Sequence, residues 1–313
     1  MEESLLVFMA ALPIYFIVAL GPVLRRTKVL TPDMDKGIMS MAVHLFFPCL
    51  IFDKVLGSNV LRDASVVATS LGIGFGLILL GTVIAWLIGP LLNLKTGSGR
   101  RTFAVTGGLQ NYGFLAIPLI AYLFPSDDVM AVLFIHNLGV DLAMWTIGLM
   151  LLSGISKPSF KVFFKGPIIA VVLSIILLQT GLDRDVPQVL RQSFEMLGGC
   201  AVPISLLLIG TVVYDLLGQV KFDWKIGLGG IVVRLGILTF LFLSVAKFVP
   251  MPTELQQVLV VQSALPSAML PIVLSRHYGG CTDVAITVVV STTIASLITM
   301  PLVISLGKAW VGV

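Results

Sequence analysis

The sequence predicts an all-α integral membrane protein in which ten transmembrane helices form a 5+5 inverted repeat. Three observations lead to this prediction: a strongly apolar composition, ten apolar runs, and proline motifs that recur half a chain apart. Of 313 residues, 57% are hydrophobic and only 12% are charged, whereas a soluble domain has about 25% charged residues. Most of the chain must therefore face lipid or other helices, so the lipid bilayer is an expected partner and nucleic acid is not.

The apolar runs are long enough to cross a bilayer as helices, which takes about 20 residues. Their expected ranges are 4–24, 37–56, 64–92, 103–124, 129–153, 168–182, 199–218, 227–249, 255–276 and 284–306. The first run begins after acidic residues and is followed by no small-residue cleavage site, so we expect a retained helix rather than a signal peptide. No connection is long enough to form a soluble domain. The expected halves are 1–153 and 168–313, joined by a short connection at 154–167.

Basic residues are distributed unequally between the connections. The odd-numbered connections hold 13 of them: Arg25, Arg26, Lys28, Lys36, Lys95, Arg100, Arg101, Lys157, Lys161, Lys165, Lys221, Lys225 and Arg276. The even-numbered connections hold 5: Lys54, Arg62, Arg184, Arg191 and Lys247. The positive-inside rule therefore places the odd-numbered connections, 154–167 included, in the cytoplasm. With ten spans, both termini are then expected outside.

Two pairs of proline motifs recur at almost the same offset. "LFFPCLIF" around Pro48 resembles "GCAVPISLLLIG" around Pro203, 155 positions later. "FLAIPLIAYLF" around Pro118 resembles "SAMLPIVLSRHYG" around Pro271, 153 positions later. Because each half has an odd number of spans, the second half must insert upside down. This inverted repeat is typical of secondary transporters.

The fourth span contains "GGLQNYGFLAIPL", in which groups that weaken a helix interrupt an apolar run. Pro118 removes a backbone donor and Gly113 lowers helix propensity. Unsatisfied backbone groups are costly in lipid, so such breaks persist only where protein or a water-filled cavity satisfies them. Gln110, Asn111 and Tyr112 are therefore candidate substrate-binding residues.

The ninth span, "VVQSALPSAMLP", is interrupted in the corresponding place by Pro266 and Pro271. Interrupted helices in matching positions of two halves are the strongest sequence pointer to a binding site at the midplane. Helix N-termini that end there favour an anion. Gln262, Ser263 and Ser267 are the candidate binding residues of this span.

Four polar side chains within other spans are candidates for a functional role. Arg234 is a functional candidate because a charge in a span is costly; it could be the counter-ion of an anionic substrate, or a partner of Asp141 or Asp215. Asp141 and Asn137 share a helix face at i, i+4 spacing and are candidates for carrying a coupling proton or cation; an ion pair between Asp141 and Arg234 is the alternative. His44 is either a proton relay or a packing residue.

Catalytic and metal chemistry are not indicated by the sequence. Cys49, Cys200 and Cys281 are far apart and suggest neither a metal site nor a disulfide framework. There is no H-E-x-x-H motif and no cluster of nucleophiles. We therefore expect no enzyme activity, no metal and no cofactor.

The same motifs carry a family likeness. "GGLQNYGFLAIPL" resembles the G-N-x-G-F-x-x-I-P-L signature of the auxin efflux carrier family, and "QSALPSAMLPIVLSRHYGG" resembles its ninth-span signature. That family includes plant auxin exporters and bacterial malate or malonate carriers. The short connection at 154–167 resembles prokaryotic or short-loop members, since long-loop plant members have a large hydrophilic segment there.

The resemblance implies a fold related to the bile-acid/sodium symporters. Spans 1, 2, 6 and 7 would form a scaffold, and spans 3–5 and 8–10 an elevator-like transport domain. Spans 4 and 9 would cross at Pro118 and Pro271, beside Gly113 and Pro266, and Asn111 would contact the substrate carboxylate. The resemblance also implies homodimers.

The leading hypothesis is thus a secondary transporter of a small carboxylate, such as auxin or the dicarboxylate malate. A sodium-coupled importer, with Gln110 and Gln262 at a cation site, is the first alternative. A membrane sensor that binds the ligand without moving it is the second.

Overall fold

A computed structural model describes residues 2–95, 97–154, 166–217 and 222–313. These residues form helices and connecting loops, with a single isolated β-bridge and no strand among them, which confirms the all-α class. The connection expected at 154–167 lies almost entirely outside the described residues. So do Lys157, Lys161, Lys165 and Lys221.

The helices follow the expected apolar runs. In the first half the elements are α1 (Glu2–Arg26), α2 (Pro32–Met41), η1 (Ala42–Phe46), α3 (Phe47–Val55), η2 (Val60–Arg62), α4 (Ala64–Ile88), η3 (Gly89–Leu92), α5 (Ser98–Gly108), α6 (Ala116–Leu123), α7 (Asp127–Ala143), η4 (Met144–Gly148) and α8 (Leu149–Ser153). In the second half they are α9 (Gly166–Thr180), η6 (Leu182–Asp185), α10 (Gln188–Gly199), α11 (Ala201–Leu217), α12 (Trp224–Ile231), η7 (Val232–Ile237), α13 (Leu238–Phe248), α14 (Thr253–Ser263), α15 (Leu270–Tyr278) and α16 (Thr282–Val311).

Within the described residues, six continuous helical stretches are long and apolar enough to cross a membrane. They are Pro32–Val55, Ala64–Leu92, Asp127–Ser153, Gln188–Leu216, Trp224–Phe248 and Thr282–Val311. The chain is therefore an integral membrane protein. The ten-span topology and its inverted symmetry stay predictions, because the other four expected spans are not among these six stretches.

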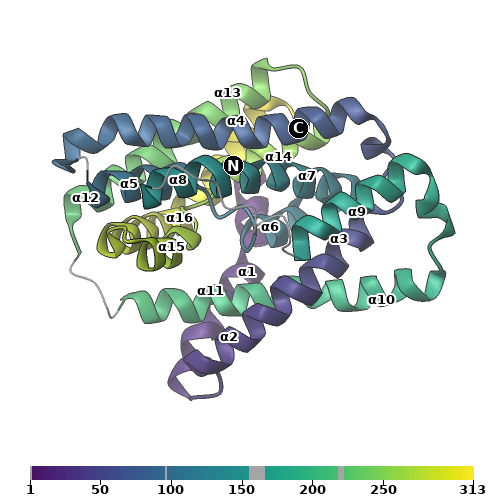
Figure 1. The fold of residues 1–313 in the computed structure, drawn as a ribbon, viewed down its shortest axis with the longest axis horizontal. Helices are drawn as coiled ribbons and strands as arrows, with labels where there is room; N and C mark the ends of the chain where they lie inside the picture. Colours follow the sequence, from purple (N-terminus) through teal and green to yellow (C-terminus); the bar gives the residue numbers. More distant parts are fainter. Residues whose placement is uncertain (1, 96, 155–165, 218–221) are drawn as a thin grey trace.

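The helices pack as two groups (Figure 1). In the first, α1 packs on α11, and α3 packs on α9 and α10; we call α1, α2, α3, α9, α10 and α11 the α11 group. In the second, α7 packs on α4 and α14, α4 on α5, and α12 on α16; we call α4–α8 and α12–α16 the α7 group. Figure 1 shows α10 and α11 along one edge of the molecule and α4 along the opposite edge.

Residues 188–199, mostly within the connection expected between the sixth and seventh spans, form helix α10. The helix begins after Pro187, which cannot sit in a helix interior but is tolerated before its first turn. It packs on α3, where the ring of Phe194 stacks on that of Phe52 with centroids 5.0 Å apart, whereas Val189 and Met196 are exposed. Together with α11 it forms the continuous apolar stretch Gln188–Leu216.

Pro48 does not break its helix. The preceding turn, η1, widens to π geometry, and α3 continues from Phe47 with Pro48 in its first turn. A proline ring clashes with the carbonyl four residues earlier and donates no hydrogen bond to it, so a wider turn accommodates the ring. Further π turns occur at η4 and η7.

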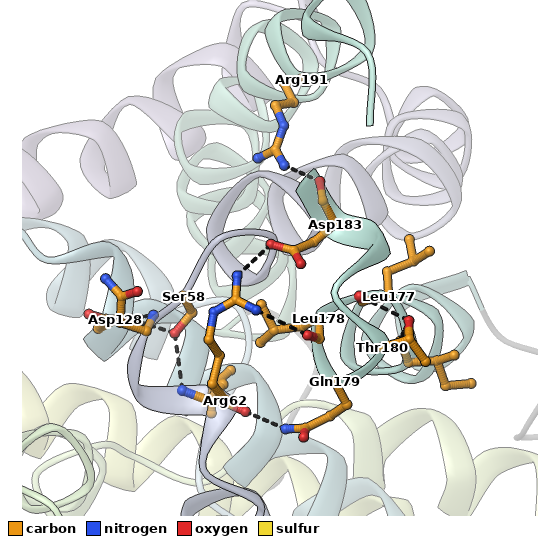
Figure 2. Close-up of polar contacts among 12 residues, drawn as sticks. Ser58, Arg62, Asp128, Leu177, Leu178, Gln179, Thr180, Asp183 and Arg191 are labelled. Atoms are coloured by element: carbon orange, nitrogen blue, oxygen red, sulfur yellow. Dashed lines mark hydrogen bonds and ion pairs between the residues drawn. The ribbon is translucent and has the colours of Figure 1, made fainter. Parts of the chain in front are cut away.

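The connection between α3 and α4 is bonded to both groups (Figure 2). Arg62 donates to Asp183 Oδ2 at 2.8 Å and to the Leu178 carbonyl at 3.2 Å, at the end of α9. Ser58 Oγ donates to Asp128 Oδ1 at 2.5 Å, in the first turn of α7. This connection therefore links the α11 group to the α7 group through polar side chains as well as through the chain itself.

Glycines set the closest helix contact in the α7 group. A Cβ added at Gly74 in α4 would lie 2.2 Å from the carbonyl oxygen of His136 in α7, so the two backbones approach closely only because no side chain separates them. Gly76, in the same helix, has open space at that position.

We expect Gly74→Ala to lower the melting temperature of the purified protein, because overpacking of a helix interface costs about 1–3 kcal/mol. Gly76→Ala is the matched control and should be neutral or stabilising, since Ala is a better helix former than Gly by about 1 kcal/mol. Thermal unfolding in detergent measures both. Equal melting temperatures for the two variants would contradict the close contact.

Candidate functional site

The two interrupted helices meet through their backbones. Between α5 and α6 and between α14 and α15, the chain is extended, and Gln110 pairs with Ser267 in an antiparallel β-bridge. The Asn111 N–H donates to the Pro266 carbonyl at 2.8 Å, and the Ala268 N–H donates to the Leu109 carbonyl at 2.9 Å. These bonds satisfy backbone groups that the helix breaks leave free, as a membrane interior requires.

The crossing lies ahead of the prolines expected to mark it. Pro118 is the third residue of α6 and Pro271 the second of α15, where a missing N–H costs little because the first turn has no intrahelical acceptor for it. Pro266, in contrast, is at the crossing and supplies one of its carbonyl acceptors. The chain thus crosses at 109–111 and 266–268, not at Pro118 and Pro271.

A chain of side-chain hydrogen bonds runs through the crossing. Gln110 Nε2 donates to Gln262 Oε1 at 2.5 Å, and Gln262 Nε2 donates to Asn137 Oδ1 at 2.9 Å. Asn137 Nδ2 donates to the Tyr112 carbonyl at 3.0 Å, and the Tyr112 hydroxyl donates to Asp141 Oδ1 at 2.6 Å. Five of the sequence-predicted residues therefore form one network that spans α7, α14 and the crossing segment.

A cavity of about 440 Å³ lies between the two groups of helices. Its polar wall comes from the α7 group and includes Asn111, Tyr112, Asn137 and Asp141. The rest of the wall is apolar and comes from both groups: Met39, Val43, Phe47, Ile51, Pro167, Ile168, Val171, Leu208, Ile209 and Val212 from the α11 group, and Gly113, Phe114, Ile117, Phe134, Leu138, Trp145, Ala268, Met269, Leu270 and Val273 from the α7 group. One end of the network thus opens into an otherwise apolar chamber.

Several predicted binding residues lie behind the crossing rather than in the cavity wall. Gln110, Gln262, Ser263 and Ser267 are fully or almost fully buried and are absent from the lining. The backbone N–H of Ser267 donates to Thr292 Oγ1 of α16 at 3.1 Å. These residues hold the crossing together, and Gln262 reaches the cavity wall through its hydrogen bond to Asn137.

Arg234 also lies behind the crossing. Its guanidinium donates to the carbonyls of Leu265 and Gln262, each at 2.9 Å, and of Ser263 at 3.3 Å. The pairing of Arg234 with Asp215 is wrong, because Asp215 binds Arg25 of α1 at 2.9 Å. Asp141 accepts from Tyr112 and lines the cavity, from which Arg234 is absent.

His44 is exposed and lies off the cavity, with its Nδ1 2.9 Å from the Ser40 carbonyl in its own helix. His136 lies beside the hydrogen-bond network but was not among the sequence-predicted site residues. It is fully buried, and its Nδ1 lies 3.3 Å from Gln262 Nε2. The only sequence signal for it was its position beside Asn137.

The three π turns each present a residue to this region. Val43 of η1 and Trp145 of η4 line the cavity, and Arg234 of η7 binds the crossing. A π turn rotates the side chains that follow it relative to a regular helix and is frequent at functional sites. These widened turns leave no recognisable signature in the hydropathy pattern.

The cavity wall combines helix N-termini and amide groups with apolar side chains. Helices α6 and α15 begin at the cavity wall, at Ala116 and Leu270, and the positive ends of their dipoles attract negative charge. Asn111 and Asn137 add amide groups. Among the described residues of the lining, none is Lys, Arg or His.

Comparison with known proteins gives a family match over nearly the whole chain. A family model described as a membrane transport protein matches residues 6–162 and 156–304. An uncharacterized transporter of Methanothermobacter thermautotrophicus is 25% identical over 298 residues, covering 93% of this chain and 95% of that protein. An uncharacterized transporter of Methanocaldococcus jannaschii is 23% identical, covering 89% of each chain. One from Saccharomyces cerevisiae is 26% identical over 126 residues, which is 40% of this chain and 19% of that protein.

We expect Gln262→Leu to lower the melting temperature markedly. The substitution leaves the Gln110 amide and Asn137 Oδ1 without their partner, at about 1–3 kcal/mol for each buried group left unpaired. Gln257→Leu, in the same helix but without a comparable buried position, is the control. If both variants unfold at the same temperature in detergent, the network does not stabilise the crossing.

Proposed function

Because the chain belongs to the membrane transport protein family, the auxin efflux carrier family that its motifs resemble, we propose that it is a secondary transporter of a small organic anion. The observation that supports this most directly is the cavity between the two helix groups, with Asn111 in its wall at the crossing. The substrate carboxylate binds Asn111 and faces the first turns of α6 and α15. The apolar body fills the remaining volume.

The lining supports a monocarboxylate such as auxin over a dicarboxylate such as malate. A second carboxylate would require a second positive partner, since a buried charge needs compensation. Arg234 was the candidate for that role, but it lies behind the crossing. Asp141, which does line the cavity, would repel the second carboxylate.

Transport follows an elevator-type alternation in this proposal. The α11 group corresponds to the scaffold and carries the surface through which the protein would dimerise, while the α7 group moves and holds the polar wall of the cavity. Because the two groups contribute opposite walls, their relative displacement changes which side of the membrane the cavity faces. Any driving force comes from gradients or the membrane potential, which acts on the charge of the anion.

The test is flux of labelled indole-3-acetate and labelled malate in proteoliposomes. Each would be measured with and without a sodium gradient, a proton gradient and an imposed potential. We expect saturable indole-3-acetate flux that Asn111→Ala reduces by about tenfold or more, the effect of losing a strong hydrogen bond to a charged group. Asn59→Ala, an exposed amide in the α3–α4 connection, should leave flux unchanged.

The other outcomes decide between the alternatives. Flux that requires sodium supports a sodium-coupled importer, and saturable binding without flux supports a membrane sensor. Unchanged flux in Asn111→Ala rejects the crossing as the substrate site. Malate carried faster than indole-3-acetate rejects the monocarboxylate assignment.

A charge effect is predicted for Asp141, which lines the same cavity as the proposed anion. We expect Asp141→Asn to raise the affinity for indole-3-acetate by about tenfold or more, because a carboxylate close to an anion opposes its binding. Binding of labelled indole-3-acetate to the purified protein measures the change. An unchanged or weaker affinity in the variant would contradict this repulsion.

Asp63→Asn is the control for this measurement. Asp63 caps the start of α4 outside the cavity lining, and hydrogen bonds from Ser65 lower its pKa, so it carries a negative charge at neutral pH. Asn is also a good helix N-cap. The variant should therefore keep the wild-type affinity.

A further inference from the structure

Arg234 is the largest fully buried side chain of the described residues, with none of its surface exposed. Its hydrogen bonds go to backbone carbonyls, and the ion pairs found in the described part of the chain do not include it. The ring of Phe242 lies 5.1 Å from its guanidinium carbon. Burying an arginine without a carboxylate is costly, so the carbonyls must supply most of the compensation.

Those carbonyls have a common origin. Gln262 and Ser263 are the last two residues of α14, and Leu265 follows in the extended segment. The carbonyls at a helix C-terminus have no intrahelical donor and form the negative end of the helix dipole. Thr239 Oγ1 donates to the Ser263 carbonyl as well, at 2.8 Å. A positive charge therefore stabilises the point at which α14 stops.

The same oxygen cluster is suited to a metal cation. Backbone carbonyls at the ends of interrupted membrane helices are ligands for Na⁺ in transporters. Two further oxygens in this region, Gln110 Oε1 and Ser267 Oγ, are buried and have no hydrogen-bond partner. The guanidinium of Arg234 donates to three of these backbone carbonyls.

We propose that Arg234 is a tethered cation that replaces a coupling sodium ion at the crossing. Held by its side chain, the charge is always present, so the crossing is ordered and anion binding at Asn111 proceeds without sodium. Arg234 acts through Gln262, whose carbonyl it binds and whose side chain reaches Gln110; it is a positioning residue. The link to anion binding rests on the proposed function, whereas the ion requirement of the fold does not.

The experiment removes the charge and supplies it from solution. Arg234→Ala, Arg234→Lys and Arg234→Met would be purified, and their melting temperatures measured in choline, sodium and potassium chloride, and in choline with millimolar guanidinium. The wild type should melt at the same temperature in every salt. Arg234→Ala should melt lower in choline and recover with guanidinium or sodium, whereas Arg234→Lys should need neither ion.

Flux provides the second readout. In proteoliposomes, sodium should raise the affinity of Arg234→Ala for indole-3-acetate by about tenfold, within the usual range for coupling between two ligand sites, and should not alter the wild type. Arg191→Ala is the control, because Arg191 donates to the Asp183 carbonyl and not to the crossing. Sodium should not change the affinity of this variant for indole-3-acetate.

Three results would overturn the proposal. The first is a wild-type protein that requires sodium for stability or flux. The second is an Arg234→Met variant as stable and active in choline as the wild type, since the stem alone would then suffice. The third is an Arg234→Ala variant that folds but responds to no added cation. Ion-dependent melting without wild-type flux under any condition would support the tethered cation and reject the transport function instead.

Discussion

The pairing of residues 109–111 with 266–268 is the contact on which the rest of the site depends. A membrane interior offers no water to free N–H and C=O groups, so two helices that stop within it must satisfy each other. Each interrupted segment provides the partner that the other lacks. The crossing is therefore a single structural unit made from both halves of the chain, and neither segment is stable there alone.

The surrounding features follow from this pairing. The extended segments end α14 at the crossing, and Arg234 donates hydrogen bonds to the carbonyls at the C-terminus of this helix. They also leave α6 and α15 starting at the cavity wall, with their N-termini toward the chamber. The negative end of α14 thus faces the buried arginine, and the positive ends of α6 and α15 face the cavity. The Gln262–Asn137 bond joins the two sides, because Asn137 lines the cavity and the Gln262 carbonyl binds Arg234.

Much of this site could be predicted from the sequence, because glutamine, asparagine and proline in an apolar span are costly unless they meet one another. Asn111, Gln262 and their neighbours could be selected on this basis. The exact residues of the crossing could not, since a proline in the first turn of a helix cannot be distinguished by sequence from one at a helix break. The sequence places Arg234 deep within its span but does not show to which side of the helix the side chain points. That orientation decides whether the side chain reaches the cavity. Helix α10 lies mostly in an expected connection, because its charged and polar residues lower the hydropathy of the segment below that of the following span.

The α3–α4 connection limits the distance over which the two helix groups can move apart in the proposed motion. From Val55 to Ala64 the chain can span only about 30 Å when fully extended. Part of this segment is not free to extend while Arg62 is bonded to the end of α9. Arg62 is thus anchored to one helix group, and Ser58 to the other through Asp128. A displacement of the two groups must first break the hydrogen bonds of Arg62 or that of Ser58. The residues released in this way can then extend to connect the two groups. The length of this loop therefore places an upper limit on the displacement of the two groups in the proposed motion.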